Sequence, residues 1–366
     1  MKIGFDGRYA EGDLVGVGKY IKNLVLGLDE LGIECIIFYT QKPKHKISGE
    51  NIRSVILPKS NRIFFEQFSL PKAFKKYKID LYNAPGNMGI PLFSNVKSVL
   101  TVHDLIPLQY KNYFNYSKLP FLSKLLYISR LKSSIKLADK IVSVSKFTKN
   151  ELVAKGVNPN KISVIYSGVN NFPKGISTKN SYGDYIINNG GLDIRKNTDG
   201  LIKSFALVHK KLPKLKLVIT GENPKFKKEL SKLVRDLNIT DSVIFTGYVS
   251  ENEMAGLIKN AKCLCYPSII EGFGFPVLEA FSLGTPVIAS NTSSIPEIAG
   301  EAAVLIDPKI TSQISEAIIK ILSNMNLSGS LIKSGKERVK MFSWKKSAKE
   351  YLNLYKQTLS SDNNLI

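Results

Sequence analysis

Two glutamates, Glu271 and Glu279, flank a glycine- and phenylalanine-rich turn in the segment Ser268–Ser290, which reads SIIEGFGFPVLEAFSLGTPVIAS. Acids stand out here, because the chain carries a formal net charge of +22. A carboxylate is a poor ligand for an anion, but it accepts hydrogen bonds from hydroxyl groups. We therefore expect these two side chains to hold a ligand that is rich in hydroxyls.

The residues between the two glutamates predict a phosphate-binding turn. The preceding run KCLCYPS is typical of a buried strand, and a helix is predicted over Phe275–Leu283. Pro276 suits the first turn of that helix and Gly284 its end. A helix start offers unpaired N–H groups and partial positive charge, and Gly272 and Gly274 let a ligand approach the backbone. A phosphate site between two acids that bind hydroxyl groups suits a ligand with a sugar on each side of a diphosphate. The pattern therefore indicates a nucleotide sugar.

Strand-like and helical runs alternate along nearly the whole chain. Strands are predicted at Lys2–Phe5, Glu34–Thr40, Arg53–Leu57, Leu81–Ala84, Ser98–Val102, Ile141–Val144, Ser163–Tyr166, Tyr185–Asn188, Lys216–Thr220, Val243–Thr246, Cys263–Tyr266, Val287–Ala289 and Val304–Ile306. Helices are predicted in the first half at Lys19–Leu31, Phe65–Tyr77, Leu122–Leu137 and Lys146–Lys155. This alternation predicts an α/β fold with two doubly wound, Rossmann-like domains facing across a cleft.

The domain boundaries follow from one irregular stretch. Residues 170–184 are polar, contain glycine and proline and lack periodicity, so they predict an interdomain linker. We expect an N-terminal domain over residues 1–169 and a C-terminal domain over 185–340. The last segment, 341–366, is expected to form a helix that packs back on the N-terminal domain.

Composition limits the class of protein. Neither a signal peptide nor an uncharged apolar run of about 18 residues is seen, so a cytoplasmic protein is expected. Cys35, Cys263 and Cys265 do not make a disulfide framework. A zinc site would need more ligands than the last two cysteines, so we expect them to be buried as small hydrophobic residues.

The positive charge is concentrated in the first half of the chain. Up to Ile165 there are 26 Lys and Arg against 12 Asp and Glu, and beyond it 26 against 18. Such a surface attracts nucleic acid, anionic lipid or phosphorylated substrates, and charge alone does not choose among them. Ordinary solvated lysines are an equal alternative.

The segment Phe245–Pro308 closely resembles the donor-binding region of family-four retaining glycosyltransferases, which have the GT-B fold. Their signature is a glutamate, seven residues and a second glutamate, here EGFGFPVLE. Further similar motifs follow in the family's order: VGVGKYIKNL, TVHDLIPLQY, ADKIVSVSKFTKNEL, VIYSGVN, GGLDIRKN and FSWKKSAKEYL. A lone glutamate pair is weak evidence, but seven ordered motifs over most of the chain are strong.

The resemblance implies a C-terminal nucleotide-sugar-binding domain and an N-terminal acceptor-binding domain. Glu279 would bind the ribose hydroxyls and Glu271 the donor sugar, as donor-binding and catalytic contacts respectively. The backbone of Gly272, Phe273 and Gly274 would meet the sugar and diphosphate. A solvated helix acid is the alternative for Glu279, and a core role is the alternative for the phenylalanine.

The resemblance also implies contacts outside the glutamate signature. Lys196 matches the lysine that contacts the diphosphate, where a fixed cation stabilises the leaving group. Many relatives carry an arginine just after the preceding strand, but this chain has glycine there, so Arg195 is a candidate to replace it; a surface arginine is the alternative. Tyr248 and Val249 would lie against the nucleobase.

The N-terminal domain offers a second group of candidates. Gly16 and Gly18 lie between the first strand and first helix, where the family's loop approaches the donor diphosphate and the acceptor; alone, they are also typical of a turn. His103 and Asp104 follow a predicted buried strand. The resemblance puts His103 beside the reacting sugar, whereas a structural histidine is the alternative.

Retaining transfer with no obvious carboxylate nucleophile predicts same-face attack, with the departing phosphate assisting deprotonation. The sequence has no Asp-x-Asp motif, and basic groups can neutralise the diphosphate, so neither a metal nor a cofactor is expected.

The forms HDLIPL and RKN resemble bacterial mannosyl- and rhamnosyltransferases of surface polysaccharide synthesis. GDP-mannose is therefore the first expected donor, with UDP-sugars behind it. A sugar-nucleotide epimerase and a basic nucleic-acid-binding protein are the competing functions.

The segment Ser117–Lys140 combines apolar and basic residues at helical spacing. One face carries Phe121, Leu125, Ile128, Leu131 and Ile135, and the charges come from Lys124, Arg130, Lys132 and Lys136. Such a helix could lie on an anionic membrane, at the inner face of the cell membrane, and the acceptor would then be a polyprenyl-diphosphate-linked saccharide. An amphipathic helix facing the core is the alternative.

Overall fold

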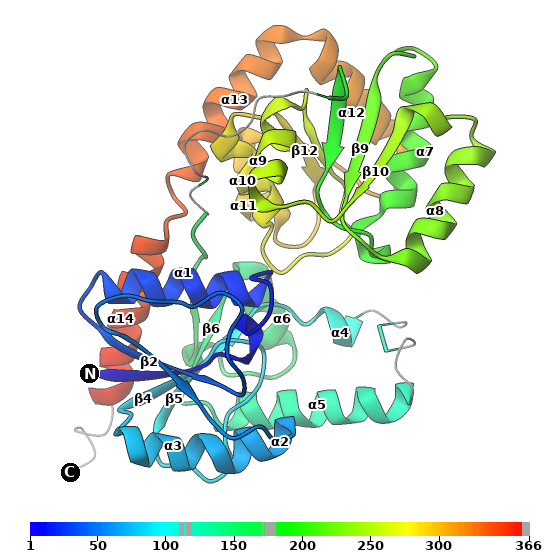
Figure 1. The fold of residues 1–366 in the computed structure, drawn as a ribbon. Helices are drawn as coiled ribbons and strands as arrows, with labels where there is room; N and C mark the ends of the chain where they lie inside the picture. Colours follow the sequence, from blue (N-terminus) through cyan, green and yellow to red (C-terminus); the bar gives the residue numbers. More distant parts are fainter. Residues whose placement is uncertain (110–112, 115–118, 170–171, 173–180, 361–366) are drawn as a thin grey trace. The chain divides into compact units, whose positions relative to one another are not determined.

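A computed structural model describes residues 1–109, 113–114, 119–169, 172 and 181–360. The chain forms two compact units, one of Met1–Gly168 with Phe342–Ile366 and one of Val169–Met341 (Figure 1). Most of the linker predicted over residues 170–184 lies outside the described residues. Both units are parallel sheets flanked by helices, which confirms the predicted α/β fold class.

Unit 1 is built on a seven-stranded parallel sheet in the order β3-β2-β1-β4-β5-β6-β7. Its strands are β1 (Lys2–Asp6), β2 (Glu34–Tyr39), β3 (Ile52–Ile56), β4 (Leu81–Ala84), β5 (Lys97–Val102), β6 (Lys140–Ser143) and β7 (Ile162–Val164). Its helices are η1 (Arg8–Ala10), α1 (Val17–Asp29), α2 (Arg62–Phe64), η2 (Phe65–Ser69), α3 (Leu70–Tyr77), α4 (Ile106–Gln109), α5 (Pro120–Leu137), α6 (Lys146–Ala154), η3 (Pro159–Lys161) and α14 (Trp344–Ser360). The strand order reverses between β1 and β4, which is where sheets of this kind bind ligands.

Unit 2 is built on a six-stranded parallel sheet in the order β10-β9-β8-β11-β12-β13. Its strands are β8 (Tyr185–Asn188), β9 (Lys216–Thr220), β10 (Val243–Gly247), β11 (Leu264–Tyr266), β12 (Val287–Ser290) and β13 (Val304–Ile306). Its helices are η4 (Ile194–Lys196), α7 (Thr198–His209), α8 (Pro224–Asp236), η5 (Thr240–Ser242), α9 (Glu251–Asn260), α10 (Phe275–Leu283), α11 (Ile295–Ala299), η6 (Gly300–Ala302), α12 (Thr311–Ser323) and α13 (Met325–Val339).

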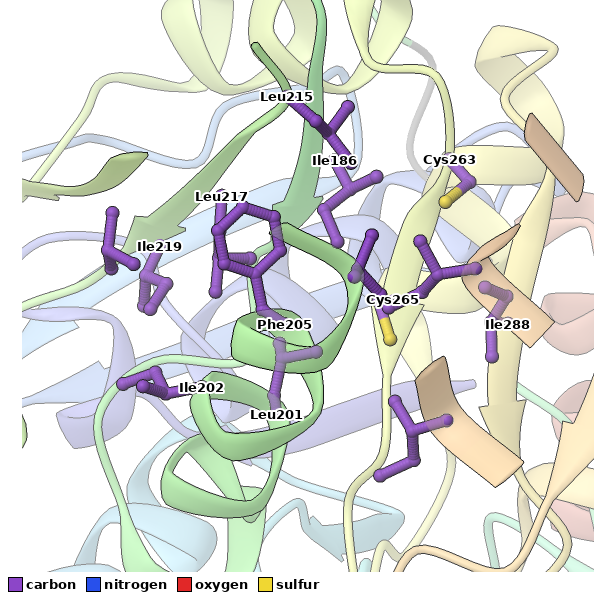
Figure 2. Close-up of a cluster of buried hydrophobic side chains, with 14 of the residues drawn as sticks. Ile186, Leu201, Ile202, Phe205, Leu215, Leu217, Ile219, Cys263, Cys265 and Ile288 are labelled. Carbon is purple, nitrogen blue, oxygen red and sulfur yellow. The ribbon is translucent and has the colours of Figure 1, made fainter. Parts of the chain in front are cut away.

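The two cysteines near β11 lie in the hydrophobic core of unit 2. Cys263 and Cys265 are fully buried and belong to the same cluster as Phe205, on α7 (Figure 2). Burial raises the pKa of the Cys263 thiol to about 12. The prediction that these residues act as small hydrophobic side chains is therefore confirmed.

The helix predicted over Phe65–Tyr77 begins three residues earlier and contains a wide turn. Asn61 caps its start, because its side chain accepts a hydrogen bond from the Phe64 N–H at 2.9 Å. The turn Phe65–Ser69 is a π-helix, and Pro71 follows it in the first turn of α3. Proline has no N–H to give to the carbonyl four residues back, so the preceding turn widens.

No helix in the described part of the chain combines the length and the apolarity that crossing a bilayer requires.

The C-terminal helix α14 is joined to the sheet of unit 1 through a buried polar network. The Tyr355 hydroxyl lies 2.5 Å from Nδ2 of Asn83 on β4, and the Tyr351 hydroxyl lies 2.9 Å from Oγ1 of Thr101 on β5. Tyr351 also bonds the hydroxyl of Tyr20 on α1. These groups are buried, so each depends on its partner for a hydrogen bond.

Replacing Tyr355 by phenylalanine is expected to destabilise unit 1 by about 1–3 kcal/mol, because Asn83 would keep a buried donor without a partner. The only tryptophan of the chain, Trp344, begins α14, so its fluorescence during urea unfolding reports on this unit. Tyr77→Phe is the matched control, because the Tyr77 hydroxyl makes no hydrogen bond to the described residues. Equal midpoints for both variants would contradict the assignment.

Candidate active site

The glutamate signature lies where two neighbouring strands of unit 2 end. Strand β11 leads into the loop that carries Glu271, and β8 leads into η4, which carries Arg195 and Lys196. Strands β8 and β11 are adjacent and parallel, so the loops that follow them meet at the same edge of the sheet. The two segments GGLDIRKN and EGFGFPVLE are brought together in this way.

Four side chains enclose the carboxylate of Glu271, which is only 7% exposed. Lys196 Nζ lies 2.6 Å from its Oε1, and Arg195 Nη1 lies 2.8 Å from its Oε2. The hydroxyls of Tyr266 and Ser268 donate to Oε1 at 2.6 and 2.5 Å. Lys196 also donates to the Tyr266 hydroxyl at 2.8 Å. The carboxylate thus fixes both cations and both hydroxyls.

The electrostatics of this cluster favour an ionised carboxylate. Burial alone would raise the pKa of Glu271, but the charges of Lys196 and Arg195 and their hydrogen bonds outweigh burial and lower it to about 2. Burial lowers the pKa of Lys196, and the attraction of Glu271 opposes that shift. Glu271 holds both cations, and Arg195 also pairs with the more exposed Asp193 at 3.7 Å.

The turn after Glu271 is held by serines that follow β12. The Glu271 N–H donates to Oγ of Ser293 at 3.0 Å, and Oγ of Ser294 donates to the carbonyls of Glu271 and Phe273 at 2.9 and 2.7 Å. Gly274 has a φ of 123°, which favours glycine. The serines therefore set the direction in which the backbone N–H groups of the turn point.

Helix α10 confirms the predicted bounds Phe275–Leu283, with Pro276 in its first turn and Gly284 as a left-handed cap. Its start has no side-chain cap, although Pro276 offers no N–H and the Val277 N–H donates to the Gly274 carbonyl at 3.1 Å. Glu279 lies one turn into this helix and is half-buried. Its Oε2 accepts a hydrogen bond from Nδ2 of Asn189 at 3.3 Å.

The aromatic residues of this region divide by exposure. Phe273 is buried and its ring lies 5.0 Å from that of Phe275, so the Phe273 side chain belongs to the core. Tyr248 follows β10 and is 66% exposed, with Val249 half-buried beside it. The tyrosine ring is free to stack on a planar group.

The glycines after β8 have a packing reason. A Cβ on Gly190 would lie 3.0 Å from the Tyr266 ring and 3.5 Å from Cδ of Lys196. An arginine at this position would crowd Tyr266 and Lys196, which both donate hydrogen bonds to Glu271. Arg195 instead reaches the same carboxylate from η4, five residues further along the chain.

The glycine loop of unit 1 is shaped by backbone constraints. Gly16 caps the start of α1 with a φ of 46°, and a Cβ there would meet nothing within 4 Å. A Cβ on Gly18 would lie 2.5 Å from the Tyr9 carbonyl oxygen, so close packing of α1 against η1 requires glycine at this position. Open space over Gly16 leaves room for a ligand.

His103 follows β5, as predicted, and three groups hold it. Its Nε2 lies 2.7 Å from the Pro85 carbonyl, its backbone N–H donates to Asn87, and its ring meets the edge of Tyr20 at 4.8 Å. Burial lowers the pKa of His103, against the opposing effect of the Pro85 carbonyl. A carbonyl only accepts, so Nε2 carries the proton and Nδ1 of the neutral ring is an acceptor.

A second buried carboxylate cluster in unit 1 escaped the sequence analysis. Glu66 on η2 accepts hydrogen bonds from Arg8 at 2.6 Å, Arg62 at 3.1 Å and Arg130 at 2.6 Å. Arg8 also pairs with buried Asp6 at the end of β1. The available signal in the sequence was that Glu66 is the single acid between residues 51 and 79.

Tyr266 and Ser268 of unit 2 were missed for another reason: nothing in their spacing marks them as hydrogen-bond donors to Glu271.

Across the described ranges, His, Cys, Asp and Glu side chains nowhere gather in groups of three that could hold a metal ion.

Comparison with known proteins identifies the class. The family description Glycosyl transferases group 1 matches residues 171–338, and Glycosyltransferase Family 4 matches residues 15–171. The O-antigen chain mannosyltransferase B of Escherichia coli is 27% identical over 78% of this chain and 76% of that protein. The O-antigen chain mannosyltransferase RfbU of Salmonella typhimurium is 33% identical over 60% of this chain and 58% of that protein.

A solved structure shows the same fold. The crystal structure of Anabaena HepE in complex with UDP and glucose superimposes with a TM-score of 0.77 and 14% identity, over 98% of this chain and 100% of that chain. Two parallel α/β units of this kind define the GT-B fold. The chain belongs to the glycosyltransferases of group 1 and family 4, and it is a GT-B glycosyltransferase.

Replacing Glu271 by glutamine is expected to destabilise unit 2 by about 3–5 kcal/mol near neutral pH, because buried Lys196 loses its counter-charge and Arg195 keeps only the exposed Asp193. The folded-state pKa is depressed from 4.5 to about 2, so the carboxylate stabilises the fold above about pH 4.5 and this contribution is lost as the pH falls towards 2. The difference between wild type and variant should therefore shrink as the pH falls.

Urea unfolding followed by circular dichroism at a series of pH values measures this difference. Glu316→Gln is the control, because Glu316 is an exposed acid of the same unit. A difference that stays constant from about pH 6 down to about pH 3 would show that the Glu271 charge does not stabilise unit 2.

Proposed function

We propose that this chain transfers a mannosyl group from GDP-mannose to a saccharide acceptor, with retention of the anomeric configuration, in bacterial surface polysaccharide synthesis. The observation that carries the proposal is the Glu271 cluster beside the uncapped start of α10. The mannosyltransferase names of the two relatives support the donor sugar. The UDP bound to Anabaena HepE supports a nucleotide diphosphate as its carrier.

The proposed donor contacts follow from the chemistry of unit 2. The diphosphate is received by Lys196 and Arg195, the two cations that Glu271 fixes, and Glu271 bonds the donor sugar. Gly272, Phe273 and Gly274 contribute backbone N–H groups. In the same donor site, Glu279 receives the ribose hydroxyls and the exposed ring of Tyr248, with Val249, receives the base.

The proposed contacts of unit 1 concern the reacting sugar and the acceptor. The open space over Gly16 takes the diphosphate or acceptor, with Gly18 holding the loop against η1. His103 bonds a hydroxyl of the reacting sugar through Nδ1, because Nε2 is engaged by the Pro85 carbonyl. Charge that develops on the leaving diphosphate is stabilised by Lys196 without a required metal. The acceptor hydroxyl attacks from the same face, and the departing phosphate accepts its proton.

The acceptor is proposed to be a polyprenyl-diphosphate-linked saccharide, with the chain acting in the cytoplasm at the inner face of the cell membrane. The support is the exposed apolar surface of α5, where Phe121 and Leu125 lie among basic residues.

A thermal-shift panel of UDP, GDP, dTDP and their sugar conjugates tests the donor site. At about a hundred times its dissociation constant, the cognate nucleotide is expected to add roughly 2.7 kcal/mol and raise the midpoint by several degrees, with the largest shift from GDP. Glu279→Ala is expected to lose the shift, whereas Glu316→Ala should keep it. A response to DNA in place of every nucleotide would favour the nucleic-acid-binding alternative and end this proposal.

Product analysis tests the reaction itself. The new glycosidic bond is expected to keep the anomeric configuration of the donor, as measured by the one-bond carbon–proton coupling at the anomeric position. Turnover is expected to persist when EDTA is present. An inverted product would exclude the same-face mechanism, loss of turnover in EDTA would exclude metal independence, and epimerised donor without transfer would identify an epimerase.

A further inference from the structure

Helix α5 is divided into two halves that differ in their partners. Leu131 and Ile135 of its C-terminal half pack against the hydrophobic core of unit 1, so the core alternative is correct for this half. The N-terminal turns extend past the sheet (Figure 1) and expose their apolar side chains to solvent. Phe121 is 82% exposed, and Leu125 of the same predicted face is also exposed.

Exposed apolar side chains come from two further segments of unit 1. We call the whole set the apolar border; it comprises Ile63, Phe64 and Phe68 from α2 and η2, Leu92 and Phe93 from the loop after β4, and Leu119, Phe121, Leu122, Leu125 and Leu126 from the start of α5. Phe93 is 82% exposed, and the rings of Phe64 and Phe68 stack at 5.1 Å. Exposed apolar surface on this scale marks a contact with a protein or a membrane.

Hydrogen bonds and a shared pocket bring the three segments together. The Leu92 N–H donates to Oε1 of Gln67 at 2.7 Å, which joins the loop to η2. Arg130 bonds both oxygens of Glu66 at 2.8 and 2.6 Å, which joins the middle of α5 to η2. Ile63 lines one pocket together with residues of the loop and of α5. The exposed start of α5 continues the same helix from these contacts.

The charges along these segments are of one sign. Residues 59–79 contain six lysines and arginines and one acid, Glu66, which is buried and neutralised by arginines. Helix α5 contains no acid at all, and it carries Lys124, Arg130, Lys132 and Lys136. An apolar surface bordered only by cations complements a bilayer that contains anionic lipid, because apolar side chains enter the acyl boundary while cations meet headgroups.

The pocket beside the border offers a place for a headgroup. Its volume is about 170 Å³, and its lining includes Ser129, Arg130 and Ser133, the apolar Ile63 and Leu92, and Glu66, whose carboxylate Arg130 bonds. Only Nη2 of Arg130 bonds Glu66; within the described residues, its Nε and Nη1 have no partner. A guanidinium with open donors in a small, partly apolar pocket suits the phosphate of a lipid headgroup.

We propose that the apolar border and its arginine pocket form a docking surface for a membrane that contains anionic phospholipid. The border supplies the apolar contact, the lysines of α5 supply attraction to the bilayer, and the pocket receives one lipid phosphate. The proposal rests on the proposed function in one respect: the docking surface would bring the chain to the membrane that carries a lipid-linked acceptor. Nucleotide binding by unit 2 is independent of it.

Co-sedimentation of the full chain with vesicles tests the proposal. The chain is expected to sediment with vesicles of equal parts phosphatidylcholine and phosphatidylglycerol, to remain in solution with phosphatidylcholine alone, and to bind less as salt rises. Absence of binding to the anionic vesicles at low salt would overturn the proposal.

Three matched sets of variants locate the surface. Phe93→Ser with Phe121→Ser should abolish binding, whereas Met325→Ser, which changes an 88% exposed apolar residue of unit 2, should not. Lys124→Gln with Lys132→Gln should weaken binding roughly twentyfold, at about fivefold for each cation, whereas Lys214→Gln with Lys228→Gln should leave it unchanged.

The third set concerns the pocket. Ser129→Glu should weaken binding to anionic vesicles about fivefold, and Ser129→Gln, which has the same size without the charge, should not. Unchanged binding in the Phe93 and Phe121 double variant would overturn the proposal, and equal binding of the two Ser129 variants would remove the pocket from it. The nucleotide thermal shift should be the same in all of these proteins, so loss of membrane binding and loss of donor binding are separate results.

Discussion

The geometry of the proposed donor site depends on one buried carboxylate. Glu271 receives hydrogen bonds from a lysine, an arginine, a tyrosine and a serine, and it is the one group that all four side chains share. Lysine and arginine side chains lose much conformational freedom when they are fixed. Because the carboxylate fixes them while the protein folds, that cost does not fall on substrate binding. This is the sense in which the site is preorganised.

The same constraint answers why a basic chain places acids beside a phosphate-binding turn. A lone buried cation would be costly, and two adjacent cations would repel each other. Glu271 allows Arg195 and Lys196 to lie close together, and the exposed Asp193 is a second partner of Arg195. In the proposed function, these cations and the start of α10 together attract a diphosphate. Replacing either cation would change the position of the other through the shared carboxylate.

The sequence predicted the elements better than the contacts. All thirteen strands were found, and Lys216–Thr220 was placed without error, since buried parallel strands are short apolar runs bounded by breakers. The wide turn at Phe65–Ser69 was missed because it depends on one proline after a helical run. His103 and Glu271 were found because motifs mark strand ends. Their partners, such as Tyr20 and Ser268, were not, because they are set by how helices pack on the sheet.

In both units, buried carboxylates hold several cations close together. In unit 2, one glutamate gathers two cations. In unit 1, Asp6 and Glu66 hold Arg8, Arg62 and Arg130, which leaves one positive charge in excess. A buried carboxylate in such a cluster holds guanidinium and ammonium groups in fixed positions. In solvent, these flexible side chains would adopt many positions. Both clusters lie beside open surface, the first near an uncapped helix start and the second near an apolar border. Under the proposal that this chain takes a nucleotide sugar from solution and its acceptor from a membrane, each cluster would fix cations for one phosphate-bearing substrate, and the buried acids make those cations compatible with a folded protein.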